Sequence, residues 1–225
     1  MGHPLIRLAL TAVLLVAYYQ AISWGRTVSQ ASQAVIDADI RRDIEASQVA
    51  FSANRHADAL GPTERLTRQL PTQAIYFDRL ARIQHELGQF TDEADAWEGV
   101  FRTSPTPGDA CPMLPAAYDR TGDADRALHA YERCVEVDPL NPDLLLFLGR
   151  AYNAADRAAD AQRVLEQALA LAPEYPDVHL VLGVRNFADN QIEVARTRFE
   201  QFLTLAPSRR DEVAVWLERT RQVSQ

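Results

Sequence analysis

The chain has 225 residues with a formal net charge of −8; 47% of its residues are apolar and 24% are charged. These values are typical of one globular domain with a short appendage, and they exclude a disordered or collagen-like chain. The acidic balance argues against nucleic acid as a partner, and the absence of Lys excludes Schiff-base catalysis and the usual phosphate-binding loop.

Residues 8–24 form an apolar segment near the amino terminus that contains no charge. At ~1.5 Å per residue a helix of this length spans ~25 Å, slightly less than a hydrocarbon core of ~30 Å. Tyr18, Tyr19 and Trp24 lie near its end, where interfacial aromatic residues are common. The segment predicts a transmembrane signal anchor over residues 1–24, followed by a polar spacer over 25–39.

A cleaved signal peptide is the alternative, because the small residues around Ala21 and Ser23 resemble a cleavage site. A buried apolar helix of a soluble protein is a third interpretation. In the first two cases the remainder of the chain lies outside the cytoplasm.

The rest of the sequence follows a period of 34 residues. Prolines recur at this spacing, at Pro71, Pro105, Pro139, Pro173 and Pro207. A turn residue precedes each of them by seventeen positions: Asn54, Gly88, Gly122, Asp156 and Asn190. The period predicts units at 40–73, 74–107, 108–141, 142–175 and 176–209.

Each unit is expected to form two helices. In 142–175 the residues Leu144, Leu148 and Tyr152 form one helical face, and Ala161 and Leu165 belong to a second. The closing proline ends the second helix, because it lacks an amide hydrogen. Small residues predict close contacts between the helices, pairing Gly149 with Ala161 and Gly183 with Ala195.

These residues resemble the tetratricopeptide repeat family. The matching positions in the fourth unit are Leu148, Gly149, Tyr152, Ala161, Leu165, Ala168 and Pro173. The resemblance covers residues 40–209 and implies an all-α fold, a right-handed α-solenoid of about five helix-turn-helix units. The sequence departs from the pattern at Asn186, Pro115 and Glu93, and Gly61-Pro62 predicts a degenerate or kinked first unit.

Residues 210–225 predict a terminal capping helix. Ser208 to Asp211 resembles a capping box, and Val213, Trp216 and Leu217 then form an apolar stripe. A solenoid needs such a helix to cover its last exposed face.

No residue pattern indicates catalysis, a cofactor, a small-molecule substrate or a metal site. The five His residues include no pair at i, i+4 on one helix, which argues against a zinc site. Asp109, Asp143 and Asp177 recur at the start of the first helix of their units. They predict either an acidic row on the concave face or favourable interactions with helix dipoles.

The two cysteines fall in the third unit. Cys111 lies at the start of its first helix and Cys134 at the end of its second, so antiparallel helices should bring them together. Outside the cytoplasm such a pair is expected to form a disulfide, and the alternative is two small buried residues that only pack.

The resemblance implies a partner-binding site on the concave surface, which the first helix of each unit lines in this family. The residues assigned to it are Arg79, Arg82, Met113, Arg120, Leu146, Phe147, Arg150, Leu180, Val181, Val184 and Phe187. Asp78, His85 and Asp119 occupy further positions of this kind. The groove is therefore expected to be charged toward the amino end and apolar toward the carboxyl end. The alternative is that some of these positions serve packing between units.

The most direct functional hypothesis is an adaptor that binds a protein or peptide partner. The expected location is a bacterial inner membrane, with the repeats in the periplasm, in envelope assembly, secretion or protein maturation; release after signal cleavage is the alternative. A self-associating structural scaffold is the second hypothesis and an enzyme the third. The all-Arg composition favours a GC-rich bacterial genome.

Overall fold

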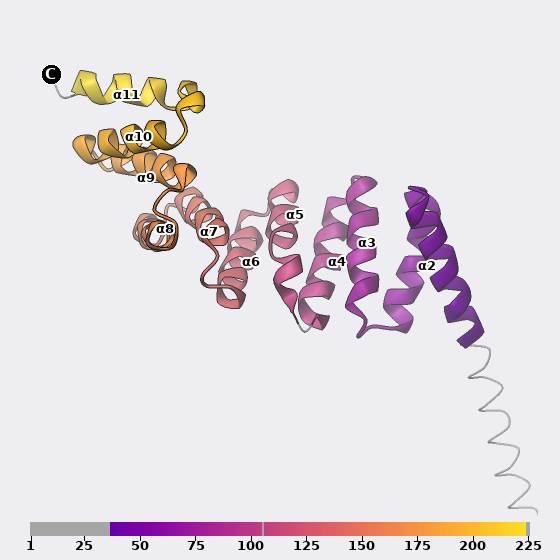
Figure 1. The fold of residues 1–225 in the computed structure, drawn as a ribbon. Coiled ribbons are helices and arrows are strands. Elements are labelled where there is room, and N and C mark those ends of the chain that lie inside the picture. Colours follow the sequence, from indigo (N-terminus) through magenta and orange to yellow (C-terminus); the bar gives the residue numbers. More distant parts are fainter. Residues whose placement is uncertain (1–36, 105, 224–225) are drawn as a thin grey trace, which may run out of the picture. The chain divides into compact units, whose positions relative to one another are not determined.

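A computed structural model describes residues 37–104 and 106–223, and every element in these ranges is helical (Figure 1). The expected all-α class is therefore confirmed for this part of the chain. The elements are a helix over residues 37–52, α2 (His56–Gln69), α3 (Ala74–Glu86), α4 (Phe90–Thr103), η1 (Pro107–Ala110), α5 (Met113–Thr121), α6 (Ala124–Val137), α7 (Pro142–Ala154), α8 (Ala158–Leu171), α9 (Pro176–Ala188), α10 (Ile192–Leu205), η2 (Pro207–Arg209) and α11 (Asp211–Val223).

The apolar segment 8–24, expected to be a transmembrane or signal helix, lies outside the described residues. Among the helices that are described, none has the length and apolar character needed to cross a membrane.

The described residues divide into two compact units, the first ending at Pro71. In this first unit, residues 37–52 pair with α2 through a bond of 2.7 Å between the buried Ser47 and Thr63 hydroxyls. Arg65 adds two bonds to the Asp43 carboxylate, at 2.7 and 3.0 Å. The helix pair forms although its sequence departs from the repeat pattern, and α2 continues through Pro62.

The second compact unit begins at Thr72, and within it each helix packs against the next along the chain (Figure 1). Tight turns link the two helices of each pair. All five predicted turn residues have positive φ: Asn54, Gly88, Gly122, Asp156 and Asn190, with values from 55° to 76°. Left-handed backbone favours Gly, and Asn and Asp tolerate it better than other residues, which explains the recurrence of these types.

The first helix of the third unit is shorter than its counterparts. Instead of one continuous helix, a 3₁₀ turn over η1 precedes α5, which begins only at Met113. Pro112 and Pro115 explain the difference, because neither can donate a helical hydrogen bond. At the first turn of α5 these missing donors cost little, since the first amides of a helix have no intrahelical partner.

Glycines allow the helices of a pair to approach closely. A Cβ added at Gly149 would lie 2.6 Å from Leu165, and one at Gly183 would lie 2.6 Å from Phe199. The expected partners were Ala161 and Ala195. The nearest atoms instead belong to large side chains one helical turn further on, so the absent Cβ makes room for a buried side chain.

Helix α11 takes the expected role of a cap for α10. Val213 is buried, and Trp216 stacks on Phe199 with ring centres 6.1 Å apart. Trp216 also meets the ring of Phe187 from α9 at 5.5 Å. Glu212, Arg219 and Arg221 are exposed, as predicted for the outer face.

Gly183→Ala should destabilise the protein by about 1 kcal/mol, because overpacking against Phe199 costs ~1–3 kcal/mol and Ala regains ~1 kcal/mol of helix propensity. Gly108→Ala is the matched control, since nothing lies within 4 Å of a Cβ added at that site. The control should leave stability unchanged or raise it by up to about 1 kcal/mol. Denaturant unfolding followed by circular dichroism measures both changes, and a similar loss of stability in both would contradict the close-approach explanation.

Candidate functional site

A buried carboxylate joins three helices at the amino end of the expected groove. Glu93 on α4 is 1% exposed and replaces the small residue usual at its position. Arg120 of α5 donates to it at 2.5 Å, and His85 of α3 lies 3.2 Å away through Nδ1. Trp97 Nε1 donates from within α4 at 3.3 Å. A large polar side chain is tolerated here because each carboxylate oxygen has a partner.

Most of the charged residues assigned to the groove therefore make internal contacts. Arg120 is paired with Glu93, and its guanidinium lies over the Phe90 ring at 5.5 Å. Arg82 makes two bonds of 2.9 Å to Asp78, four residues earlier on α3, and lies over the ring of Trp97 at 5.8 Å. Arg79 is half-buried. The amino end is charged as predicted, but its charges are mostly neutralised within the fold.

The apolar residues assigned to the groove are mostly used in packing. Leu146 is only 2% exposed and belongs to the core between α7, α8 and α9, so it does not line a surface. Leu180, Val184 and Phe187 pack against the buried cluster formed by α10 and α11, and Val181 packs against the preceding core. The sequence could not distinguish these positions from surface positions, because the covering residues come from other helices.

Two assigned residues do present apolar surface. Met113 on α5 is 41% exposed and Phe147 on α7 is 37% exposed, and they occupy equivalent positions 34 residues apart. Phe147 is stacked on Tyr131 of α6, with ring centres 6.1 Å apart. The Tyr131 hydroxyl donates to Asp119 of α5 at 3.1 Å, and burial raises the pKa of this phenol. Among the residues assigned to the groove, the most exposed apolar side chains thus belong to α5 and α7 rather than to α9.

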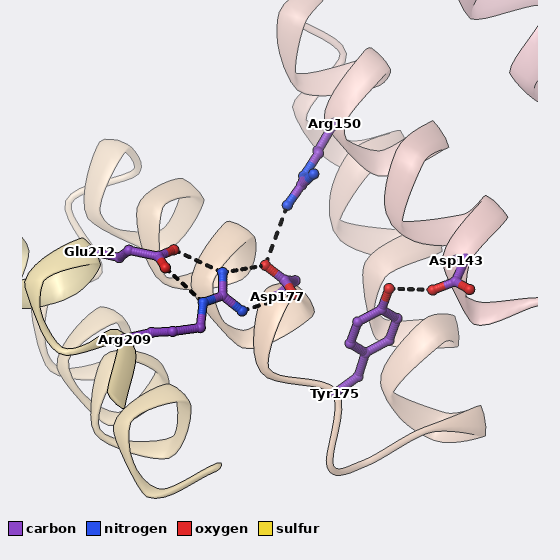
Figure 2. Close-up of polar contacts among 6 residues, drawn as sticks. All are labelled: Asp143, Arg150, Tyr175, Asp177, Arg209 and Glu212. Carbon is purple, nitrogen blue, oxygen red and sulfur yellow. Dashed lines mark hydrogen bonds and ion pairs between the residues drawn. The ribbon is translucent and has the colours of Figure 1, made fainter. Parts of the chain in front are cut away.

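The carboxylates at the helix starts make two separate sets of contacts, one between Tyr175 and Asp143 and one that joins Asp177 to Arg150 and Arg209 (Figure 2). Asp177 accepts two bonds from Arg209, at 2.9 and 3.1 Å, and lies 3.7 Å from Arg150. Arg209 also donates to Glu212, at 2.6 and 2.8 Å. Tyr175 donates to Asp143. For Asp143 and Asp177 these contacts favour the structural interpretation over a free acidic row.

These contacts shift the pKa values of Asp177 and Tyr175. Hydrogen bonds from Arg209, with the charge of Arg150 nearby, lower the pKa of the Asp177 carboxyl. Partial burial, followed by the bond to Asp143, raises the pKa of the Tyr175 phenol to about 12. Asp177 therefore stays ionised and Tyr175 stays protonated at neutral pH.

The two cysteines lie together as predicted. Their sulfurs are at disulfide distance, and the Cα atoms of Cys111 and Cys134 are 5.2 Å apart. Both residues are buried, and Leu144 of α7 packs against them. Cys111 precedes α5 instead of lying within it, so the pair fixes the region where the helix is shortened.

Among the described residues, no three His, Cys, Asp or Glu side chains are grouped in a way that could hold a metal ion. In the clusters described above, the carboxylates are paired with Arg, His, Tyr or Trp side chains.

A family model of the tetratricopeptide repeat matches residues 120–183. The matched segment is similar to tetratricopeptide repeats. It contains α6 to α8 and most of α9, and therefore Phe147 and Arg150. No curated relative matches the chain.

Solved structures of tetratricopeptide repeat proteins show the same fold over a longer range. YrrB, described as having an unusual peptide-binding site, is 16% identical with a TM-score of 0.65, over 77% of this chain and 89% of its own. The MamA protein is 14% identical with a TM-score of 0.63, over 74% and 91%. TTC0263 of Thermus thermophilus is 21% identical with a TM-score of 0.53, over 81% and 99%. At these identities the likeness establishes the fold alone.

Sequence analysis missed the residues that complete these clusters. It noted Glu93 as a departure from the repeat pattern without recognising that His85 and Arg120 would converge on it. It did not identify Tyr175 and Arg209 as partners of the helix-start carboxylates, although both end their units and lie 32 residues after those carboxylates. The equal spacing of 32 residues is the sequence signal that could have identified both pairs.

Glu93→Gln should destabilise the protein by about 2 kcal/mol, because Arg120 loses its anion while the side chain keeps its shape. Arg120 is partly exposed, which keeps the loss below that of a fully buried pair. Glu86→Gln, on the exposed side of α3, should change stability by less than about 0.5 kcal/mol. Urea unfolding of both variants at pH 7 tests this, and equal midpoints would refute the role of Glu93.

Asp177→Asn should lower the free energy of unfolding by about 1 kcal/mol at pH 7. Folding lowers the pKa of the Asp177 carboxyl. Its contribution to stability is therefore fully present above the unfolded pKa of ~3.9 and is lost as the pH falls through the folded pKa. The difference in urea midpoint between wild type and Asp177→Asn should therefore shrink between pH 7 and pH 3. Asp95→Asn, at an exposed position on α4, should show no such pH dependence. A difference for Asp177→Asn that is constant with pH would exclude the ion pair.

Proposed function

We propose that the chain is an adaptor that binds a protein or peptide partner on the surface formed by Met113, Phe147 and Arg150. The observation that carries the proposal is the exposure of Phe147, a large aromatic side chain on the first helix of a repeat. The neighbouring Leu146 is buried and the equivalent region of α9 packs against α10 and α11, whereas Phe147 offers an aromatic anchor at the surface.

The surroundings of Phe147 suit the recognition of a peptide. Its ring rests on Tyr131, whose hydroxyl is held by Asp119, so the aromatic surface is rigid before a partner arrives. Preorganised aromatic residues contribute strongly at interfaces because little side-chain entropy is lost. Three residues further along α7, Arg150 lies 3.7 Å from Asp177, which Arg209 already binds more closely. Arg150 therefore retains donors for a carbonyl or carboxylate of the partner.

We further propose that the repeats act on the extracytoplasmic side of a bacterial membrane, tethered by residues 8–24, during envelope assembly, secretion or protein maturation. The apolar segment in the sequence, the Arg-only composition and the cysteine pair support this location. The peptide-binding site described for YrrB supports binding as the use of this fold.

Photo-crosslinking in intact cells tests both proposals. A photoreactive residue at Met113 should capture one foreign protein of the envelope, whereas the same residue at the exposed Arg163 on α8 should not. Phe147→Arg should reduce capture at least about tenfold, as expected for a hot-spot residue. Val194→Arg, which changes an exposed valine on α10, should leave capture and the melting temperature unchanged.

Other outcomes distinguish the alternatives. Crosslinks only between copies of the chain would favour the self-associating scaffold. Capture of a cytoplasmic protein would contradict the proposed location but not the adaptor role. Equal capture by the Phe147→Arg variant would reject the proposed surface.

A further inference from the structure

Neighbouring repeats are joined by an equivalent hydrogen bond at two successive boundaries. Tyr118 of α5 donates to Glu98 of α4 at 3.2 Å, and Tyr152 of α7 donates to Glu132 of α6 at 2.9 Å. In both cases the Glu precedes the Tyr by 20 residues and the bond crosses from the second helix of one repeat to the first helix of the next. We refer to this bond as the Tyr–Glu clasp.

Arginines strengthen both clasps. Arg133 donates to Glu98 at 2.8 and 3.0 Å, and Arg157 donates to Glu132 at 3.0 Å. Each tyrosine ring also lies beneath a guanidinium, at 5.0 Å for Arg126 over Tyr118 and 4.3 Å for Arg157 over Tyr152. The phenols are buried at these boundaries, where a hydrogen bond to a charged acceptor contributes more than an exposed one.

The clasp is missing at the boundary between α8 and α9. The 34-residue register places Glu166 and Asn186 at the equivalent positions. Glu166 is exposed and accepts from Gln162 on its own helix at 2.5 Å. Asn186 is buried and donates to Gln191 at 2.8 Å, within its own helix pair, while its Oδ1 has no partner among the described residues.

Among the described residues, the hydrogen bonds and ion pairs across this boundary lie at the amino-terminal end of α9, and toward its other end the charge of Asp156 acts on Arg185. Tyr175 binds Asp143, and Asp177 lies near Arg150 (Figure 2). Val178 and Leu182 pack into the core of α7 and α8. Further along α9, Val184 and Phe187 instead pack with α10 and α11. One end of α9 is therefore fixed to the preceding repeat, and the other belongs to the carboxyl-terminal helices.

We propose that α9, α10 and α11 form one cooperative unit that separates from α8 and loses its helical hydrogen bonds before the preceding repeats do, with the contacts of Tyr175 and Asp177 the last to break. In a repeat array each boundary contributes its own interface energy, so the α8/α9 boundary should open more readily than the two boundaries that have a clasp. The proposal concerns this boundary alone and does not depend on the identity or existence of a partner.

Native-state hydrogen exchange with mass spectrometry on the full chain tests this proposal, because a helical amide exchanges only when its hydrogen bond opens. The amides of α9, α10 and α11 should exchange as one block, faster than those of α7 and α8. Simple fraying from the chain end would instead give a gradient in which α11 exchanges fastest and α9 slowest. That gradient, or equal rates in α8 and α9, would overturn the proposal.

Asn186→Tyr supplies the missing phenol. It should slow exchange of the block by about two- to tenfold, the equivalent of one hydrogen bond. Glu166→Ala alone should change little, but it should abolish the gain in the Asn186→Tyr background. A folded Asn186→Tyr variant with unchanged exchange would refute the proposal.

If Asn186→Tyr does not fold, a second variant tests whether the Tyr–Glu clasp stabilises repeat boundaries. Tyr152→Phe removes one clasp and keeps the ring, so it should raise exchange across α7 to α11 by about two- to tenfold. Tyr76→Phe, which removes a half-buried hydroxyl from α3 away from any clasp, is the matched control. Equal exchange in the two variants would show that the clasp does not secure repeat boundaries.

Discussion

Each pair of helices in this chain buries one apolar face within itself and leaves another that only the next pair can cover. The structure depends on this constraint, because the chain has no single centre around which a core could form. Residues that recur every 34 positions provide the repeated contacts, and α11 ends the series by placing Trp216 against Phe199 and Phe187. The left-handed turn residues keep the helices of each pair close enough for this packing.

Charge is used mainly inside the fold. Glu93, Glu98, Glu132 and Asp177 each bind an Arg from another helix, and two of these Glu residues also accept from a Tyr of the next repeat. Arg suits this use because its planar fork can bind a carboxylate while its face lies over an aromatic ring. The net charge of −8 therefore says little about the partner. Among the residues assigned to the groove, Met113 and Phe147 keep exposed apolar surface.

The features that could be predicted from sequence depend on the backbone of a single residue or on the geometry of a single helix pair. Asn54 and Gly122 mark turns because few residue types accept positive φ, and Cys111 and Cys134 follow from antiparallel helices of known length. The groove was predictable only in part, because exposure depends on what neighbouring helices contribute. Leu146 and Phe147 are adjacent in sequence, yet one is buried and the other exposed. The periodicity of the sequence does not show that several helices meet at Glu93.

The cysteine pair has a consequence for the order in which the protein matures. Cys111 and Cys134 are 23 residues apart and lie within one repeat, Cys111 just before α5 and Cys134 near the end of α6. Pairing them requires only that this helix pair has formed, since no later part of the chain takes part. During synthesis the sulfurs can thus be joined while α7 to α11 are still to emerge. The cysteine pair can thus stabilise the third repeat before the carboxyl-terminal helices pack onto it.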